Sequence, residues 1–459
     1  MPGESGGAGG GARLIEELRV AGAETTRVVA VLWTWLDRHL LELGSLREKL
    51  PRIREVAIGR EGEFEGIDEG LLGWIGEAPL RNGAELLAWI DCTLGMPGDG
   101  LMLPSVGFEG EEVIVAWRRT DLVRLVSDSK RPPTASEHPS LTTLAQSLLV
   151  CPRELGGLEL IPQRLEGVEG EVVRNSLESA LQGDPPSLEV HLDTLGSAGL
   201  PVRFDIDNQL ELAALVKEME GKQGETQTAI DAAVDAAKGP SRILLLPELT
   251  ASDETLRALS EKLSGLGGEG PALTVVGRYH RGGDGGDEVD PALLGDSEAG
   301  LYVNEAVVLG PFGKELWRHR KFSSAGGRFP TDDGPRYLVE NIRLGRSLTA
   351  VETPLGIVAV PICLDTFSAH GRARLERSPA NVLLVPSLSR SVQRHGASLR
   401  LLVGVLWGLA FVCNRWLEPI DRDGNWDADE NRSFWVVQGS DEIKVEAGEG
   451  GRPSFVFTL

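Results

Sequence analysis

An uninterrupted apolar run, Ile-Leu-Leu-Leu at residues 243–246, ends abruptly at Pro247 and Glu248. A short run of this kind, bounded by turn residues, is typical of a strand that is buried on both faces of its sheet. Residues 223–238 before it place Ala, Ile and Val side chains on one face of a helix, which a Gly-Pro pair then ends. Alternation of helices with such strands predicts a layered α/β architecture.

Similar apolar runs recur as far as the C-terminus. We interpret residues 399–413 as a buried helix, because the run is longer than most strands. The remaining runs predict strands at 210–216, 273–277, 306–309, 349–352, 356–361, 381–386, 434–438, 442–446 and 454–458. Residues 205–459 are therefore expected to form one domain.

The first part of the chain has a different pattern. We expect a disordered tail at residues 1–12, followed by an N-terminal domain over 13–200. Helical periodicity covers 13–50 and 70–95, and β-forming residues at 112–117 predict a strand, so this region is mainly helical with some mixed α/β character. It contains no group of residues to which we can attach a chemical role.

The charge of the chain limits its partners. The 459 residues carry a formal net charge of −23, and phosphate binding needs clustered Lys and Arg, so we expect no affinity for nucleic acid or anionic membranes. The apolar runs at 28–36 and 401–413 are shorter than the roughly 20 residues that cross a bilayer. No secretory signal is visible, and we expect a cytoplasmic protein.

The four cysteines are Cys92, Cys151, Cys363 and Cys413. They form no CxxC pair and no metal-like spacing with histidine, so we expect neither a disulfide framework nor a metal site. Three of them are interpreted as buried small apolar residues. Cys363 differs because it follows the β-rich residues 358–362, where a strand passes into a loop or helix.

Three polar residues at predicted strand ends make a chemically complete set. A cysteine attacks only as its thiolate, and a carboxylate such as Glu248 can take the thiol proton. The ammonium group of Lys321, from the basic segment 317–322, can lower the thiol pKa and stabilise the oxyanion that forms on an attacked carbonyl. Glu248, Lys321 and Cys363 would therefore support acyl transfer without a metal.

These residues resemble the motifs of the nitrilase, or carbon–nitrogen hydrolase, superfamily. The matching segments, in chain order, are Leu-Pro-Glu248, Arg-Lys321-Phe, Glu340-Asn-Ile-Arg-Leu-Gly345, the hairpin around 351–358 and Pro-Ile-Cys363-Leu-Asp365. The resemblance covers about 255 residues, a little over half of the chain. It lacks the glutamate that the family usually carries on the helix after the cysteine strand.

The resemblance implies a four-layer α-β-β-α sandwich, pairing into a homodimer or larger oligomer, and no cofactor. It implies that Glu248 is the base, Lys321 the oxyanion stabiliser and Cys363 the nucleophile, with Glu340 as a second acidic group. The N–H of Leu364 would help to hold the oxyanion. Asp365 and His370 are placed beside the substrate, Asp365 more as a structural hydrogen-bond acceptor than as a catalyst.

The expected reaction is cleavage of a linear amide or carbamoyl C–N bond through a thioester. A nitrile is less favoured, because Cys363-Leu-Asp365 is closer to the amidase pattern. Two alternatives stay open: an acyltransferase in which an amine replaces water, and a regulated effector or catalytically quiet interaction module, which the long N-terminal extension suggests. A cysteine–histidine protease, using His319, His370 or His395, is disfavoured because no surrounding pattern supports it.

Overall fold

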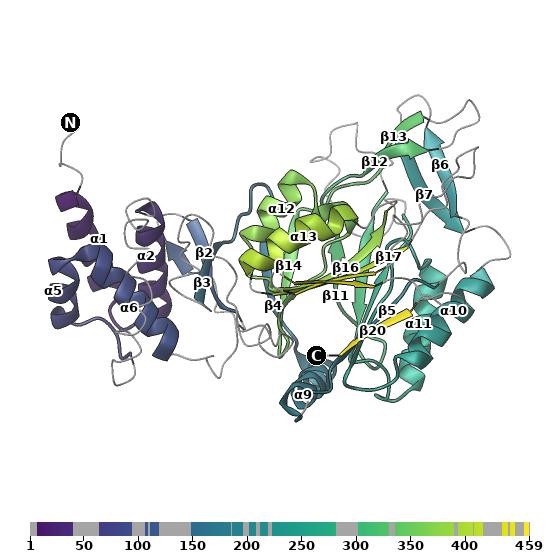
Figure 1. Cartoon of the computed structure of the whole chain (residues 1–459), viewed down its shortest axis with the longest axis horizontal. Helices are drawn as coiled ribbons and strands as arrows, with labels where there is room; N and C mark the ends of the chain where they lie inside the picture. Colours follow the sequence, from purple (N-terminus) through teal and green to yellow (C-terminus); the bar gives the residue numbers. More distant parts are fainter. Residues whose placement is uncertain are drawn as a thin grey trace. The chain divides into compact units, whose positions relative to one another are not determined.

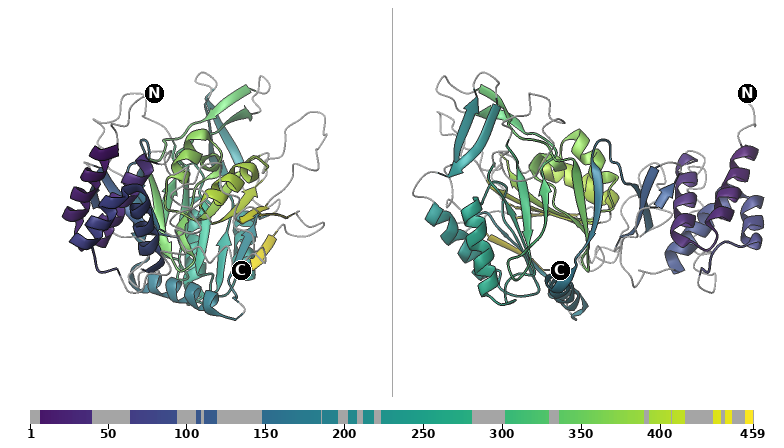
Figure 2. Two further views of the ribbon diagram at one scale, coloured as in Figure 1. Left: turned by 60° about the vertical axis from the view of Figure 1, so that its left-hand side comes forward. Right: turned by 180° about the vertical axis from the view of Figure 1, so that it is seen from behind.

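The computed structural model divides the chain into two compact units (Figures 1 and 2). One contains residues 1–121, 128–155 and 377–379, and the other contains 122–127, 156–376 and 380–459. The structure describes residues 7–39, 64–93, 106–108, 111–118, 148–184, 186–195, 202–207, 212–218, 223–280, 302–329, 336–389, 393–406, 408–415, 434–438, 441–445 and 454–458.

The first unit combines helices with a small antiparallel sheet. The helices are α1 (Gly7–Ala21), α2 (Thr25–Arg38), α5 (Glu69–Glu77) and α6 (Pro79–Thr93), and the strands are β1 (Val106–Phe108), β2 (Glu111–Trp117) and β3 (Leu148–Pro152). Helix α1 begins within the tail that we expected at residues 1–12. The predicted helical stretch 13–50 is broken at Gly22, whose positive φ of 54° favours glycine, and its last part lies outside the described residues.

Apart from residues 122–127, the second unit begins at Gly156, whereas the sequence predicted a division near residue 200. Strand β4 (Glu159–Arg164) pairs in parallel with β14 (Ser347–Thr353), and β5 (Glu189–Asp193) pairs in parallel with β8 (Arg242–Leu245). Helix α9 (Gly167–Gln182) contributes Val173 and Leu177 to the core between the sheets. The weak periodicity of residues 140–200 hid these elements.

Two large sheets form the centre of the second unit. The six-stranded sheet has the order β11-β10-β9-β8-β5-β20, and the seven-stranded sheet has the order β19-β18-β17-β16-β15-β14-β4. The strands not yet given are β9 (Leu273–Gly277), β10 (Glu305–Leu309), β11 (Glu315–Arg320), β15 (Gly356–Ala359), β16 (Val382–Leu388), β17 (Leu409–Arg415), β18 (Phe434–Gln438), β19 (Asp441–Val445) and β20 (Ser454–Thr458).

Alternate side chains of β8 define the layers. Ile243 and Leu245 belong to the core shared by the two sheets, whereas Leu244 and Leu246 belong to a second core with α10 (Gln223–Ala236) and α11 (Asp253–Gly265). Helices α12 (Ala369–Glu376) and α13 (Gln393–Leu406) cover the outer face of the seven-stranded sheet (Figure 1). The expected four-layer α-β-β-α order is therefore present.

One predicted element was wrong. We expected a buried helix over residues 399–413, but α13 ends at Leu406 and β17 begins at Leu409. Strand β17 is central in its sheet, between β16 and β18, and both of its faces are buried: Leu409, Phe411 and Cys413 face the core between the sheets, and Ala410 and Val412 are buried on the opposite face. Its composition alone therefore cannot distinguish it from a buried helix. At Gly408 a Cβ would lie 1.8 Å from the carbonyl oxygen of Asn381, so the chain can turn there only with glycine.

A smaller sheet extends from the two large ones (Figure 2). Its order is β12-β13-β7-β6, with β12 (Gly326–Phe329), β13 (Arg336–Glu340), β7 (Leu212–Glu218) and β6 (Val202–Asp207). Strand β13 ends at Glu340, whose side chain lies beside Lys321 at the end of β11 in the six-stranded sheet. Within the described part of the chain, no helix is both long enough and apolar enough to cross a membrane.

Candidate active site

One edge of the six-stranded sheet collects four polar side chains. Strands β8 and β9 are parallel, β10 runs antiparallel to β9, and β11 runs antiparallel to β10. The C-terminal ends of β8, β9 and β11 and the N-terminal end of β10 therefore meet at the same edge. Glu248, His280 and Lys321 follow the first three strands, and Asn304 precedes the fourth.

Gly277, at the end of β9, holds the backbone of Glu248 in place. Its N–H donates to the carbonyl oxygen of Pro247 over 3.1 Å, and its own carbonyl accepts from the N–H groups of Thr250 and Ala251. A Cβ on this residue would lie 2.5 Å from the Cα of Glu248, which is closer than real Cβ atoms approach. The end of β9 and the loop that carries Glu248 can therefore approach this closely only with glycine.

Gly277→Ala is expected to displace Glu248. We expect a loss of about 1–3 kcal/mol in the free energy of unfolding and a fall of about tenfold or more in kcat/KM, because a small displacement of a reacting group is costly. Chemical denaturation and steady-state kinetics measure the two effects. Gly265→Ala is the matched control, since a Cβ there meets nothing within 4 Å. Equal changes in the free energy of unfolding and in kcat/KM for the two variants would contradict this role of Gly277.

Lys321 lies between two buried carboxylates. Its Nζ donates to Glu248 Oε1 over 2.7 Å and to Glu340 Oε2 over 2.8 Å. The side chain of Asn304 donates to both acids through Nδ2, over 2.8 Å to Glu248 Oε1 and 2.7 Å to Glu340 Oε1. The three charged residues are all buried, so their interactions are weakly screened by solvent.

The two carboxylates differ in how fully their acceptor positions are used. Glu340 accepts four hydrogen bonds, because His280 Nε2 also reaches Oε1 at 2.9 Å and the N–H of Ala325 reaches Oε2 at 2.9 Å. Since a carboxylate offers about four acceptor positions, Glu340 is saturated. Glu248 accepts only one further bond, at Oε2 from the N–H of Leu388 over 2.9 Å. Among the described residues one acceptor position of Glu248 is free, and so is the third hydrogen of the Lys321 ammonium.

The cluster fixes the charge state of its members. Burial by itself would lower the pKa of Lys321, but the charges of Glu248 and Glu340 outweigh burial and raise that pKa well above its ordinary value. Burial by itself would raise the pKa of Glu340, but the charge of Lys321 and the hydrogen bond from His280 hold it well below its ordinary value. Lys321 is therefore an ammonium group and Glu340 a carboxylate across the neutral pH range.

Cys363 comes from the other sheet. It follows β15 and begins a short 3₁₀ turn, Cys363–Thr366, with a φ of +45°, a conformation that is strained for a residue other than glycine. Leu388, at the end of the parallel neighbour β16, connects it to Glu248: its carbonyl accepts from Cys363 Sγ at 3.8 Å, and its N–H donates to the Glu248 carboxylate. The Cys363 thiol and the Glu248 carboxylate therefore both bond to the backbone of Leu388.

The thiol is more basic than the sequence led us to expect. Burial and, to a smaller extent, the charge of Glu248 raise the pKa of Cys363 to about 12, against the opposing charge of Lys321. Lys321 does lower this pKa, as the sequence predicted, but burial and the charge of Glu248 together outweigh it. At neutral pH the thiol therefore carries its proton.

The other predicted site residues are placed differently. Asp365 is fully buried, and its carboxylate accepts from the N–H groups of Phe322 (3.1 Å) and Ile362 (3.0 Å), so it ties the segment after Lys321 to the turn that carries Cys363. Leu364 is half-buried within that turn. His370 is exposed on α12, in contrast to the buried cluster.

Sequence reasoning missed several residues of the cluster. Asn304 and His280 stand beside apolar strands, as Glu248 does, and this position was the available signal. Leu388 acts through its backbone and leaves no signal in the sequence. His395 was named only within the disfavoured protease alternative, yet its Nε2 lies 4.0 Å from Cys363 Sγ.

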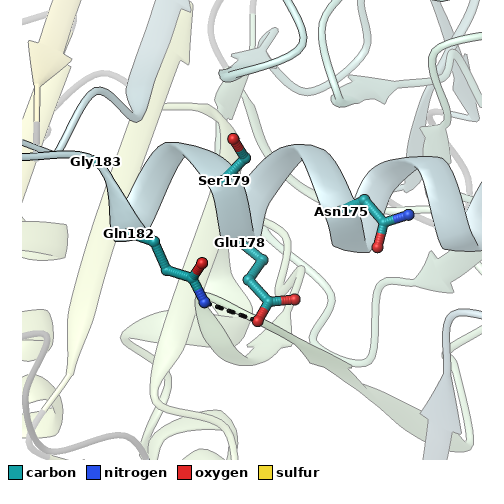
Figure 3. A pocket seen from close by; sticks show the side chains of 5 residues that line it. All are labelled: Asn175, Glu178, Ser179, Gln182 and Gly183. Atoms are coloured by element: carbon teal, nitrogen blue, oxygen red, sulfur yellow. Dashed lines mark hydrogen bonds between the residues drawn. The ribbon is translucent and has the colours of Figure 1, made fainter.

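A surface hollow lies along α9, outside this cluster (Figure 3). It is lined by Asn175, Glu178, Ser179, Gln182 and Gly183, and Gln182 Nε2 donates to Glu178 Oε1 over 2.9 Å. Its polar side chains all come from the surface of one helix, so we assign no function to it.

No family model matches the chain, and no curated protein matches it. Among solved structures, it is similar to an amidase from Nesterenkonia sp., with 16% identity and a TM-score of 0.37 over 60% of this chain and 90% of that chain. It is similar to Nit3 of Saccharomyces cerevisiae, a member of branch 10 of the nitrilase superfamily, with 18% identity, a TM-score of 0.36 and coverage of 60% and 90%. It is also similar to a glutamine-dependent NAD+ synthetase from Acinetobacter baumannii, with 17% identity and a TM-score of 0.38 over 60% of this chain and 45% of that chain.

Proposed function

We propose that this chain is a carbon–nitrogen hydrolase of the nitrilase type, which cleaves a linear amide or carbamoyl compound through a thioester on Cys363. The observation that carries the proposal is the unequal use of the two buried carboxylates. Glu340 has no acceptor position left, while Glu248 keeps one and Lys321 keeps one hydrogen, among the described residues. A base and an oxyanion donor are thus available beside a protonated thiol.

The catalytic roles that we propose follow from the free acceptor position of Glu248 and the free hydrogen of Lys321. Cys363 Sγ attacks the carbonyl carbon as its proton passes to Glu248, and the oxyanion accepts a hydrogen bond from the third N–H of the Lys321 ammonium group, which keeps its proton. Glu248 then gives the proton to the departing nitrogen, and ammonia or an amine leaves as the C–N bond breaks. Water next attacks the thioester and loses a proton to Glu248, the C–S bond breaks, and Glu248 returns that proton to the sulfur.

Glu340 acts as a positioning residue in this scheme. Its four hydrogen bonds fix Lys321, Asn304 and His280, so that the ammonium group is held in one place before substrate arrives. An ammonium group that needs no reorganisation stabilises developing charge more effectively than a mobile one.

Trapping the covalent intermediate tests the proposal. The purified protein is mixed with a panel of linear primary amides and carbamoyl compounds, and ammonia release and intact mass are followed together. We expect an adduct whose mass equals the substrate minus ammonia, located on Cys363 by peptide mapping and absent from Cys363→Ser. Cys151→Ser is the control, because Cys151 is buried in the first unit. Ammonia release that continues at the same rate in Cys363→Ser would overturn the proposal.

A further inference from the structure

His395 joins three elements around the thiol. It lies fully buried in α13, and its Nε2 is 3.0 Å from the hydroxyl of Ser387 in β16 and 4.0 Å from Cys363 Sγ. Its Nδ1 is 3.0 Å from the hydroxyl of Thr366, in the turn that begins with Cys363. The edge of the Phe367 ring packs against the imidazole, with 4.6 Å between ring centroids. The scheme above uses none of these contacts.

The hydrogen bonds determine which nitrogen of His395 carries the hydrogen. The hydroxyl of Thr366 donates to the carbonyl oxygen of Cys363 over 2.8 Å, which uses its only hydrogen. The contact between Thr366 and Nδ1 must therefore be a donation from Nδ1–H to the hydroxyl oxygen. In the neutral ring Nε2 is then an acceptor, and the Ser387 hydroxyl donates its hydrogen to it.

The imidazole remains neutral in this environment. Burial, with a smaller contribution from the charge of Lys321, lowers the pKa of His395 to about 3. An ion pair with the thiolate, as in a cysteine protease, is therefore not its role. The Ser387 hydroxyl, in turn, lowers the pKa of Cys363 by hydrogen bonding, against the larger opposing effects of burial and Glu248 and beside the charge of Lys321. One hydroxyl hydrogen thus has two competing acceptors, Nε2 and the thiolate sulfur.

We propose that His395 is a positioning residue for Cys363 that acts through Ser387: while the thiol is protonated, Nε2 holds the Ser387 hydroxyl beside the sulfur, and the hydroxyl turns to the sulfur when the thiolate forms. The inference rests on the proposed function, in which Cys363 becomes a thiolate when the C–S bond of the thioester breaks and the electron pair passes to sulfur. Ser387 donates a hydrogen bond at that moment and transfers no proton; the proton still returns from Glu248.

The arrangement predicts opposite effects of the two side chains on the thiol. Ser387→Ala removes a donor to the thiolate, so the pKa of Cys363 rises. His395→Leu removes the competing acceptor, so the Ser387 hydroxyl can donate to the thiolate without giving up a hydrogen bond to Nε2. The pKa of Cys363 therefore falls. Each unit of pKa changes the thiolate fraction tenfold and the intrinsic nucleophilicity about threefold in the opposite sense, so the net change in alkylation rate is about threefold per unit.

A double-mutant cycle on alkylation tests the inference. Iodoacetamide modification of Cys363 is followed by peptide mass in the full-length protein at pH 8. We expect Ser387→Ala to react about threefold more slowly than the unmodified protein and His395→Leu about threefold faster. In the Ser387→Ala background, His395→Leu must have no further effect, because its influence passes through the hydroxyl. His395→Gln, which retains an acceptor, should react at nearly the rate of the unmodified protein.

A merely structural histidine gives a different result. If His395→Leu only loosens the pocket, alkylation accelerates equally with and without the Ser387 hydroxyl, and the inference is overturned. Should His395→Leu fail to fold by circular dichroism, Thr366→Val provides a second route. It removes the acceptor of Nδ1–H, releases the ring to place its hydrogen on Nε2, and is expected to accelerate alkylation only when Ser387 is present. Alkylation requires no turnover, so this outcome is independent of whether the amidase proposal holds.

Discussion

Glu248→Gln is expected to lower kcat/KM by about 10²–10⁴-fold, the usual contribution of a positioned general base. The amide of glutamine has nearly the shape of the carboxylate but cannot take a proton from the thiol. Glu248 also raises the pKa of Cys363, so its replacement by a neutral group lowers that pKa from about 12. The variant should therefore lose turnover while its thiol becomes more reactive to iodoacetamide, by about threefold for each unit of pKa.

This pair of opposite changes separates a base from a residue that only supports the fold. A structural carboxylate, when replaced, would slow turnover and leave the intrinsic reactivity of the thiol unchanged. Glu315→Gln is the matched control: it removes the same charge from β11, at the end opposite to Lys321, where Glu315 pairs with Arg318 at the surface. We expect both rates to stay within twofold in that control. Slower alkylation in Glu248→Gln would contradict the role assigned to this carboxylate.

The pH dependence of turnover follows from the same charges. Glu340 has a lowered pKa, so the stability it contributes is fully present above its ordinary value of 4.5 and is lost as the pH falls through the lower value. Lys321 has a raised pKa, so its contribution is fully present below 10.5 and is lost as the pH rises through the higher value. The cluster is intact between these limits, and activity should fall outside them together with the near-ultraviolet circular dichroism of the native state.

The sequence was informative where a polar residue follows a doubly buried strand. Glu248 and Cys363 stand out because an ionisable group at the end of an apolar run is costly to bury without a partner. The structure brings Glu248, Lys321 and Glu340 into direct hydrogen bonding, while the chemical roles of these residues stay predictions. Asp365 lies in a similar context, but its partners are two backbone N–H groups and His319 Nε2 at 3.4 Å. Its position in the sequence alone could not distinguish a structural residue from a site residue.

Other features could not be predicted because they depend on pairing between distant segments. Strand β17 is central in its sheet and buried on both faces, and no local pattern shows whether such an apolar run pairs as a strand or forms a helix. Strand β5 joins the six-stranded sheet by pairing in parallel with β8, more than forty positions away. For this reason the boundary between the two units lies nearer the N-terminus than the sequence predicted. The direction in which the thiol pKa shifts likewise depends on burial and on which charged groups the fold places near Cys363.

Lys321→Met is expected to be the most destabilising single change at the site. Methionine fills a similar volume, but it leaves Glu248 and Glu340 buried without their cation, and loss of one partner from a buried ion pair costs about 3–5 kcal/mol. Turnover should fall to background, because the oxyanion loses its donor. The control Lys262→Met breaks a partly exposed pair with Asp235, 3.0 Å apart, and should change the free energy of unfolding by about 0.5 kcal/mol or less.

The direction of the pH effect identifies the cause of this instability. Between pH 8 and 5 the native protein keeps the stability that Glu340 contributes, because the pKa of Glu340 lies below its ordinary value of 4.5. In Lys321→Met, protonation of one carboxylate relieves the repulsion between the two. Lowering the pH from 8 to 5 should therefore narrow the difference in the free energy of unfolding between the two proteins. Glu340→Gln added to Lys321→Met should likewise recover part of the loss, because one charge then remains instead of two. A gap that stays constant with pH, measured by urea denaturation, would show that lost packing rather than unpaired charge explains the effect.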